Sequence, residues 1–361
     1  MRIAIGAVLG TLGGPATYAR ELIRALSVVD VANDYIVIAD RPDLLSLHGP
    51  NVLCVRAPLP SVFLQPFWDH GWVPYFLRRY RADVYHGTKG VLPVRAGCPA
   101  VVTIHDLAVY HQPATFALLQ RVQQRVHTPM AVRCAARVIA DSEHARRDLL
   151  QRFRLSPQRV TAIPLAAASI FSAQPGVNDE RIVADLHLPE RYLLYAGTIQ
   201  PRKNVEALVA AFASLSAAAG IWLLIAGRVR PGYRPRFLTD APRRVRYLGP
   251  VSDEVLAVLY RRALALCSPS SFEGFGLSLI EAMASGCPVI AAANSAVEEL
   301  VGGCGILVRG VSAEALRPAL ERAIGAGGGL DGMRALGLAR AAQYSWQETA
   351  RRTLAVYRAA L

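Results

Sequence analysis

The stretch SPSSFEGFGLSLIEAMASGCPVIA, residues 268–291, decides the fold. An apolar run at 264–267 stands before it and predicts a buried parallel strand, and its last residues predict the next one. Between the two strands, a glycine-broken loop holds Glu273 and leads into an apolar helix predicted over 277–284, which a glycine and a proline end. This order of strand, loop, helix and strand is typical of a doubly wound parallel sheet.

The start of this helix suits a phosphate group. The sequence offers it no strong side-chain cap, so we expect the backbone amides of Gly276, Leu277 and Ser278 to lack partners and, with the helix dipole, to favour an anion. Glu273 lies just before these amides and Glu281 one turn inside the helix, and carboxylates accept hydrogen bonds from sugar and ribose hydroxyls. The alternative is that Glu281 only favours the helix N-terminus and that Glu273 is a solvated loop acid.

Length and composition indicate a globular protein of two domains. The 361 residues are 53% hydrophobic and 19% charged, which suits two buried cores and excludes a disordered chain. The net charge of +13 is dispersed, and it favours anionic ligands or an anionic membrane surface over a nucleic-acid groove. Lys89 and Lys203 are the only lysines. A chain that otherwise uses arginine can keep lysine where a compact ammonium group is needed.

Cysteines and two apolar segments bear on the cellular setting. The six cysteines show no CxxC spacing and lie mostly in apolar runs, which is typical of buried thiols in a reducing compartment and disfavours a structural zinc site. Residues 1–19 resemble a secretory signal, but their glycines suit a strand and a turn better. Residues 207–227 are uncharged over the length of a membrane span, but Gly220 divides them into a helix and a strand. We therefore expect a cytoplasmic protein.

Strands and helices alternate along the chain. Short apolar runs predict strands at 3–9, 35–39, 52–55, 84–86, 101–104, 138–140 and 160–163, and again at 192–196, 221–226, 245–248, 264–267, 288–291 and 306–308. The periodicity lapses between the two sets, where prolines bracket small residues. The prediction is an α/β protein of two doubly wound, Rossmann-like parallel-sheet domains facing across a cleft, with domains at 1–165 and 177–345, a linker at 166–176 and a final helix at 346–361.

Ligand-binding residues are expected just after strands, because such sheets bind ligands beyond the carboxyl ends of their strands. Gly13 and Gly14 form a strand–helix turn that lets the backbone approach a phosphate or a sugar, although the segment does not read GxGxxG and a turn without a ligand is equally compatible. His105 ends the run VVTIH and can hydrogen-bond a sugar hydroxyl, stabilise a developing charge or be an inert histidine. His86 is a weaker candidate of the same kind.

Arg202 and Lys203, in GTIQPRKN, are the strongest cationic candidates. They follow a strand and precede a helix, where the arginine fork and the lysine ammonium can neutralise a diphosphate. The alternative is a solvated charge pair, which the nearly uncharged helix behind them and the rarity of lysine disfavour. No DxD pair occurs, so no divalent metal site is predicted. Cations and helix amides would then stabilise a diphosphate leaving group without a metal ion.

Several segments together resemble glycosyltransferase family 4, the mannosyltransferase-like glycosyl transferases group 1, which are retaining enzymes of the GT-B fold. GGPATYARELIRAL, VVTIHDL and VIADSEHARRDLL are similar to segments of that family's first domain, and YAGTIQPRKNVEALVAAF is similar to its phosphate-binding stretch. Residues 268–291 match its E-x7-E motif. YSWQETARRTLAVYRAAL resembles the terminal helix that crosses back to the first domain. E-x7-E alone is a weak pattern, but joined to GTIQPRKN in this order it is specific.

The resemblance implies a role for each candidate residue. Catalytic roles fall to Glu273, His105, Arg202 and Lys203, and donor binding falls to Gly13, Gly14, Arg202, Lys203, Gly276, Leu277, Ser278 and Glu281. In that family's pattern the two cations bind the donor diphosphate, Glu281 holds the ribose, and Glu273 and His105 contact the transferred sugar. The resemblance also implies retention of anomeric configuration without a metal or a cofactor, with the leaving phosphate taking the acceptor's proton.

The chain departs from the family pattern at two places. Alanines stand at 166–168, where the family often shows an aspartate. The stretch VEELVGGCG lacks a second family aspartate, while Glu299 fills the glutamate position. These departures bear on the identity of the sugar more than on the type of reaction.

Other classes of protein compete with this interpretation. A nucleic-acid binder would explain the charge, but the chain lacks a basic stripe interleaved with exposed aromatic residues. A catalytically silent sugar-nucleotide sensor would keep the pocket, but both acids and both cations are intact. A phosphorylase or an epimerase of similar fold stays open.

The acceptor is the least determined feature. Aromatic residues at 63–76 lead into Arg78, Arg79 and Arg81, a combination that suits an interfacial membrane contact. The alternative, a helix packed in the domain, is slightly favoured. We nonetheless hypothesise a lipid-linked saccharide acceptor at the inner face of the plasma membrane, in the synthesis of cell-surface polysaccharide or lipopolysaccharide. GDP-mannose is the favoured donor, with UDP-glucose, UDP-N-acetylglucosamine and dTDP-rhamnose as alternatives.

Overall fold

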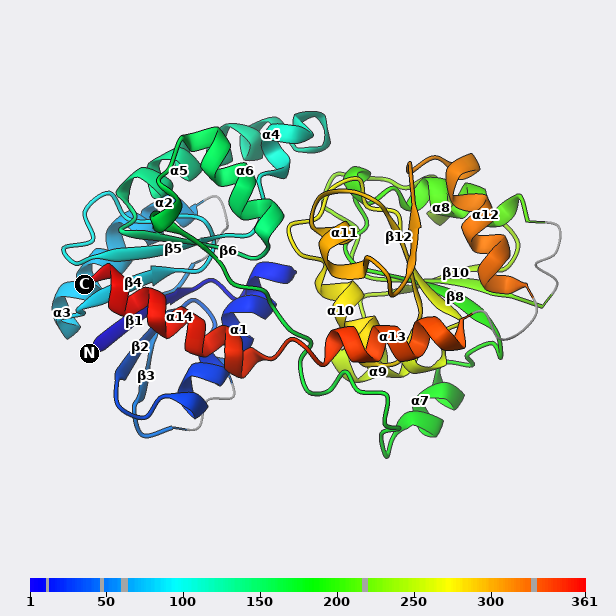
Figure 1. Ribbon diagram of the computed structural model, residues 1–361, viewed down its shortest axis with the longest axis horizontal. Coiled ribbons are helices and arrows are strands. Elements are labelled where there is room, and N and C mark those ends of the chain that lie inside the picture. Colours follow the sequence, from blue (N-terminus) through cyan, green and yellow to red (C-terminus); the bar gives the residue numbers. More distant parts are fainter. Residues whose placement is uncertain (11–12, 46–48, 60–63, 216–219, 326–329) are drawn as a thin grey trace. The chain divides into compact units, whose positions relative to one another are not determined.

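The computed structural model describes residues 1–10, 13–45, 49–59, 64–215, 220–325 and 330–361 (Figure 1). The chain divides into two compact units. Unit 1 comprises Met1–Leu165 and Ser345–Leu361, and unit 2 comprises Ala166–Tyr344. Each unit is built around one parallel sheet with helices on its faces.

The sheet of unit 1 has seven parallel strands in the order β3-β2-β1-β4-β5-β6-β7. The strands are β1 (Arg2–Ala7), β2 (Asp34–Ala39), β3 (Val52–Arg56), β4 (Val84–Gly87), β5 (Ala100–Ile104), β6 (Arg137–Ala140) and β7 (Val160–Ala162). The inner strands are buried along almost their whole length, as a sheet covered on both faces requires.

The helices of unit 1 include one from the far end of the chain. They are α1 (Gly14–Val29), α2 (Gln65–Phe67), the π-helical turn η3 (Trp68–Trp72), α3 (Val73–Tyr80), α4 (Ala108–His111), α5 (Leu118–Cys134), α6 (Glu143–Phe153) and α14 (Trp346–Ala360). α14 packs against α1 (Figure 1), and Thr349 Oγ1 donates to the carbonyl of Pro164 at 2.8 Å. The C-terminal helix is therefore part of the fold of unit 1.

The sheet of unit 2 has six parallel strands in the order β10-β9-β8-β11-β12-β13. The strands are β8 (Tyr192–Ala196), β9 (Trp222–Ala226), β10 (Val245–Gly249), β11 (Ala265–Ser268), β12 (Val289–Ala292) and β13 (Ile306–Val308). The helices are α7 (Asp179–Asp185), α8 (Val205–Ala213), α9 (Asp253–Arg262), α10 (Leu277–Ala284), α11 (Ser295–Val301), α12 (Ala313–Ile324) and α13 (Asp331–Ala341).

Both sheets follow one topology, in which the first strand lies between the second and the fourth. The direction of winding reverses there, between β1 and β4 in unit 1 and between β8 and β11 in unit 2, and ligands bind doubly wound sheets at this switch point. Each strand predicted from the apolar runs is present, with small shifts at its ends. The predicted pair of Rossmann-like parallel sheets is confirmed.

Two expectations about apolar residues have different outcomes. In the described ranges, no helix combines the length and the hydropathy needed to cross a membrane. The uncharged segment divides into α8 and β9, and residues 216–219 between them lie outside the described part. The expectation of mostly buried cysteines is wrong for Cys54 and Cys134, which are exposed. Cys54 lies on the edge strand β3, and Cys134 is the last residue of α5.

Candidate active site

Two loops of unit 2 meet at its switch point. β8 pairs with β11, so the loops that leave their carboxyl ends start side by side. The first loop runs through the short 3₁₀ helix η6 (Pro201–Lys203), which carries both predicted cations. The second loop carries Glu273 and ends at Gly276, where φ is 102° and a Cβ atom would lie 2.9 Å from Leu279 Cδ1. Glycine is required there, because the positive φ with which the loop enters α10 is strained for any residue that carries a Cβ atom.

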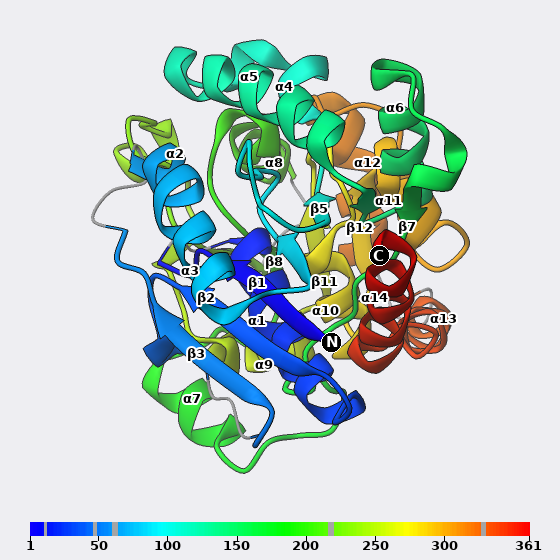
Figure 2. The same ribbon diagram turned by 90° about the vertical axis from the view of Figure 1, so that its left-hand side faces the viewer.

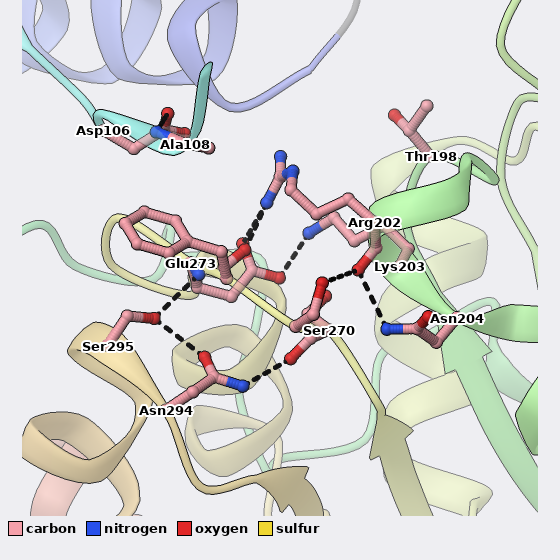
Figure 3. Close-up of polar contacts among 12 residues, drawn as sticks. Asp106, Ala108, Thr198, Arg202, Lys203, Asn204, Ser270, Glu273, Asn294 and Ser295 are labelled. Atoms are coloured by element: carbon pink, nitrogen blue, oxygen red, sulfur yellow. Dashed lines mark hydrogen bonds and ion pairs between the residues drawn. The ribbon is translucent and has the colours of Figure 1, made fainter. Parts of the chain in front are cut away.

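Arg202, Lys203 and Glu273 form one cluster of charges (Figure 3). Lys203 Nζ donates to Glu273 Oε1, and Arg202 Nη1 donates to the carbonyl of Phe272 and lies 3.7 Å from Glu273 Oε2. The three side chains are only 12%, 17% and 11% exposed. The two cations are therefore turned toward the acid and not toward bulk water.

The cluster keeps a net positive charge. Burial opposes ionisation of Glu273, but Lys203 and Arg202 outweigh it and hold the pKa of this carboxyl below its usual range. Two cations thus face one ionised carboxylate. An excess of positive charge on side chains so shielded from water is complementary to an anionic ligand.

Polar residues that the sequence analysis missed hold the Glu273 loop in place (Figure 3). The Glu273 amide donates to Ser295 Oγ at 2.9 Å, Ser295 Oγ donates to Asn294 Oδ1 at 2.8 Å, and Asn294 Nδ2 donates to the carbonyl of Ser270 at 2.6 Å. From the first loop, Asn204 Nδ2 reaches the carbonyl of Pro269 at 3.0 Å. Asn294 and Ser295 follow β12, so the rule that ligand-site residues follow parallel strands could have found them.

The start of α10 and Glu281 form the neighbouring part of this site. No side chain caps the helix, and Leu277 and Ser278 in its first turn are partly exposed. The amides of Leu277 and Ser278 have no partner within the helix and can receive a phosphate. Glu281 lies one turn further along α10 and is buried. Tyr260 Oη donates to its Oε2 at 3.4 Å.

His105 lies at the carboxyl edge of the other sheet, in unit 1. Ile104 of β5 pairs with Ala140 of β6, so the next residues, His105 and Asp141, leave the sheet side by side. His105 Nδ1 lies 2.7 Å from Asp141 Oδ2, and its Nε2 lies 2.9 Å from the carbonyl of Thr88. Burial opposes the positive charge, but Asp141, the Thr88 carbonyl and Asp106 outweigh it and raise the pKa of His105 above its usual value.

His86 is a core histidine. Its side chain is fully buried between two hydroxyl groups, with Nδ1 2.7 Å from Tyr357 Oη and Nε2 2.8 Å from Thr103 Oγ1. Burial and the nearby charge of His105 lower the pKa of His86 to about 3. Its role is to join α14 to the sheet of unit 1.

The remaining residues to place are Gly13 and Gly14 of unit 1 and Glu299 of unit 2. Gly13, with φ 132°, immediately precedes α1, and Gly14 is the first residue of that helix in unit 1. Residues 11–12 of the glycine-rich turn lie outside the described part. Glu299 is an exposed residue of α11. Among the residues that the structure describes, no group of three His, Cys, Asp or Glu side chains is placed to hold a metal ion.

Known proteins share both the sequence pattern and the fold. Residues 12–166 match the model of Glycosyltransferase Family 4, and residues 178–327 match that of Glycosyl transferases group 1. O-antigen chain mannosyltransferase B of Escherichia coli is 28% identical over 292 residues, which cover 78% of this chain and 76% of that protein. A D-inositol 3-phosphate glycosyltransferase of a Nocardioides species is 30% identical over 349 residues, which cover 89% and 73%.

A solved structure gives the same result for the fold. Anabaena HepE, crystallised in complex with UDP and glucose, superposes with a TM-score of 0.78 at 17% identity over 98% of both chains. The two family models together span most of the sequence, and Arg202, Lys203 and Glu273 meet at the switch point of the sheet of unit 2. The chain therefore belongs to glycosyltransferase family 4, the group 1 glycosyl transferases, and is a hexosyltransferase of the GT-B fold.

Proposed function

We propose that this enzyme is a retaining, metal-independent transferase that moves a hexose from a nucleotide-diphosphate sugar to a lipid-linked saccharide acceptor in cell-surface polysaccharide or lipopolysaccharide synthesis. The observation that carries the proposal is the shielded cluster of Arg202, Lys203 and Glu273 beside the open start of α10. Both parts favour a diphosphate, the cations by charge and the helix by its free amides.

The cluster suggests how the leaving group is stabilised. Arg202 Nη1 donates to the neutral carbonyl of Phe272, and a phosphate oxygen is a stronger acceptor for a guanidinium group. As the bond from the anomeric carbon to the phosphate breaks, Arg202 and Lys203 stabilise the growing charge on the diphosphate. The acceptor oxygen bonds to the same face of the sugar, and its proton passes to the leaving phosphate, so no protein base is needed.

GDP-mannose is the proposed donor. The Escherichia coli relative is named a mannosyltransferase, which supports mannose, whereas the UDP bound to HepE keeps UDP-sugars as alternatives. Metal independence is supported by the absence of a DxD pair from the sequence.

A thermal-shift panel tests the donor. GDP-mannose, UDP-glucose, UDP-N-acetylglucosamine and dTDP-rhamnose are each added in the presence of EDTA. A ligand present at 100 times its Kd stabilises the folded state by about 2.7 kcal/mol, so the true donor raises Tm by several degrees. Stabilisation that appears only with a divalent metal would contradict metal independence, and no stabilisation by any of the four would contradict the donor class tested. Donor hydrolysis by the purified protein separates an enzyme from a silent sensor.

A surface of unit 1 supports the lipid-linked acceptor. Arg78, Arg79 and Arg95 line a groove of about 730 Å³ between α3 and the loop at 93–95, together with His70 and Tyr75. The three arginines form no ion pair within the described part of the chain. The aromatic segment before them is divided: Trp68 and Phe76 are buried in the core, whereas Phe67, Trp72 and Tyr75 are exposed. The buried residues agree with a helix packed in the domain, and the exposed residues agree with a membrane contact.

Exposed residues of α5, which belongs to the same unit as α2 and α3 (Figure 2), extend this surface. Leu118, Leu119, Val122 and Val126 are exposed along one side of the helix, and the sequence holds no acidic residue from 107 to 140. The rings of His70 in the groove and His127 in α5 lie 6.3 Å apart, so the helix adjoins the groove. Exposed apolar residues next to unpaired arginines are complementary to an anionic lipid surface.

Vesicle flotation tests this surface. We expect the protein to float with vesicles that contain 30% phosphatidylglycerol and not with pure phosphatidylcholine. The triple variant Arg78→Gln/Arg79→Gln/Arg95→Gln should lower the partition coefficient roughly 100-fold, because each arginine near an anionic surface contributes about 1 kcal/mol. The control removes three exposed arginines of unit 2, Arg181, Arg309 and Arg322, and changes binding little. Equal binding to both kinds of vesicle, or equal losses in both triple variants, would contradict the proposal.

A further inference from the structure

The two partners of the His105 ring can only accept hydrogen bonds. Nε2 faces the carbonyl of Thr88 at 2.9 Å, and Nδ1 faces a carboxylate oxygen of Asp141 at 2.7 Å. A neutral imidazole carries one N–H group and offers its other nitrogen as an acceptor, so it satisfies only one of these contacts. The geometry therefore requires one proton on Nε2 and a second proton between Nδ1 and Asp141.

The second proton belongs on the histidine. The ordinary pKa of histidine exceeds that of aspartate by about 2.6 units, so an imidazolium–carboxylate pair starts with a clear advantage over a neutral pair. Asp141 also directly precedes Ser142, the N-cap of α6, where the positive end of the helix dipole favours a carboxylate. Burial of Asp141, whose Oδ1 has no hydrogen-bond partner in the described part of the chain, works against this charge.

His86 shows that the arrangement around His105 is specific. His86 lies within β4 and His105 directly follows the neighbouring strand β5, but the nitrogens of His86 face two hydroxyl groups, which can donate as well as accept. A neutral ring satisfies both contacts of His86. The charged or titratable groups around the His105 ring include Asp141 directly after β6, Asp106 in its own loop, His86 from β4 and Tyr18 from α1, whose ring lies edge-on at 5.0 Å.

We propose that Asp141 is a positioning residue which, with the Thr88 carbonyl, holds His105 as a fixed imidazolium. Any substrate that touches the ring then meets its C–H groups and its positive charge, because both nitrogens are already occupied. His105 thus serves glycosyl transfer through its positive charge, which stabilises negative charge. The catalytic half of this statement rests on the proposed function, since it concerns negative charge that develops during glycosyl transfer.

The protonation state is measured on the free enzyme by long-range ¹H–¹⁵N NMR of protein labelled with ¹⁵N-histidine. The His105 signals are identified by their loss in His105→Gln. At pH 7.5 we expect both nitrogens of His105 to be protonated. In Asp141→Asn the amide can donate to Nδ1, so the ring should become neutral with its proton on Nε2. A neutral His105 in the wild-type protein at this pH would overturn the inference.

Kinetics test the consequence for catalysis. An opposite charge shifts a pKa by about 1–3 units, so in Asp141→Asn the alkaline fall of kcat should begin at least one pH unit lower than in the wild type. Asp141→Glu should restore part of this range, which a merely structural role for Asp141 would not predict. The control is Asp148→Asn. Asp148 makes a second His–Asp contact, since its Oδ2 lies 2.6 Å from Nε2 of the exposed His111, and its substitution should leave the pH profile of kcat unchanged.

The two measurements separate the two claims. A doubly protonated His105 together with a pH profile that Asp141→Asn does not move would overturn the catalytic role and keep the geometry. Failure of every donor to bind would overturn the proposed function without touching the NMR result. A shifted profile in Asp148→Asn as large as that in Asp141→Asn would overturn the assignment to Asp141.

Discussion

The two sheets share one strand order but place different chemistry at their carboxyl edges. In unit 2, an arginine and a lysine stabilise the ionised form of one glutamate, and guanidinium groups are not deprotonated in proteins. In unit 1, an aspartate maintains the charge of one histidine, which would otherwise be lost near neutrality. The comparison shows how one topology supports a permanent positive site and a conditional one. Substitutions in unit 2 should therefore act at every pH, whereas those around His105 should act mainly at high pH.

Removal of either cation of unit 2, Arg202 or Lys203, is the most severe way to test this comparison. Arg202→Ala and Lys203→Ala should each lower kcat/KM by about 100- to 1000-fold, the usual cost of losing one group that stabilises transition-state charge. The loss should be equal at pH 6.5 and at pH 8.5. Steady-state kinetics measure it, with Arg309→Ala in the same unit as the control. A loss confined to alkaline pH would mean that these two side chains, like His105, act through a charge that depends on pH.

Glu273→Gln should affect both activity and the acid stability of unit 2. The pKa of Glu273 is lowered in the folded state, so its stabilising contribution is present above the unfolded value near 4.3 and is lost as pH falls through the folded pKa. The Tm of the variant should be lower than that of the wild type at pH 7, and the difference should shrink below pH 4. A constant difference across this range would show that the carboxylate charge is not what stabilises the loop.

Asn294→Ala sharpens the role of the supporting loop. The substitution removes the donor to the Ser270 carbonyl and the acceptor for Ser295, which in turn holds the Glu273 amide. We expect a fall in kcat of about 10-fold, since small displacements of a catalytic group reduce rates strongly. Asn178→Ala is the matched control, because its amide donates to an exposed acid, Glu254, at 2.7 Å. Equal kinetics for both variants would count against a positioning role for Asn294.

Tyr357→Phe should have the smallest effect and should act on stability alone. The phenol joins α14 to His86, and its loss leaves one buried ring nitrogen unpaired at a cost of about 1–3 kcal/mol. Chemical denaturation measures this loss. Donor affinity and the pH profile of kcat should stay at wild-type values. A shifted pH profile would mean that His86 takes part in the charge balance around His105.

The fold could be predicted from the sequence because buried parallel strands are short apolar runs between turn residues. The apolar helix 277–284 was predicted at the positions it occupies, since glycines bound it on both sides. The aromatic segment before Arg78 was harder to interpret. The π-helical turn η3 adds a residue to the helix and shifts the phase of the exposed side chains, so that Phe67 and Trp72 are exposed while Trp68 and Phe76 are buried.

For the candidate site, the sequence predicts which residues follow a strand, but not the contacts between residues of different loops. Arg202, Lys203 and Glu273 each follow a strand, and their meeting follows from the order of the strands. The partners of His105 could not be predicted, because the pairing with Asp141 depends on the register between β5 and β6. Asn294 and Ser295 are short polar residues of a kind common in loops, and only their contacts distinguish them.

Binding of the free nucleoside diphosphate tests the central claim most directly. Titration calorimetry in EDTA compares GDP and UDP on the wild type, on Arg202→Ala/Lys203→Ala, and on Arg309→Ala/Arg322→Ala, which removes two exposed cations of the same unit. The account predicts that one of the two nucleotides binds the wild type and the control double variant alike, and that the cluster variant loses at least 100-fold in affinity. Equal affinity for all three proteins would contradict it.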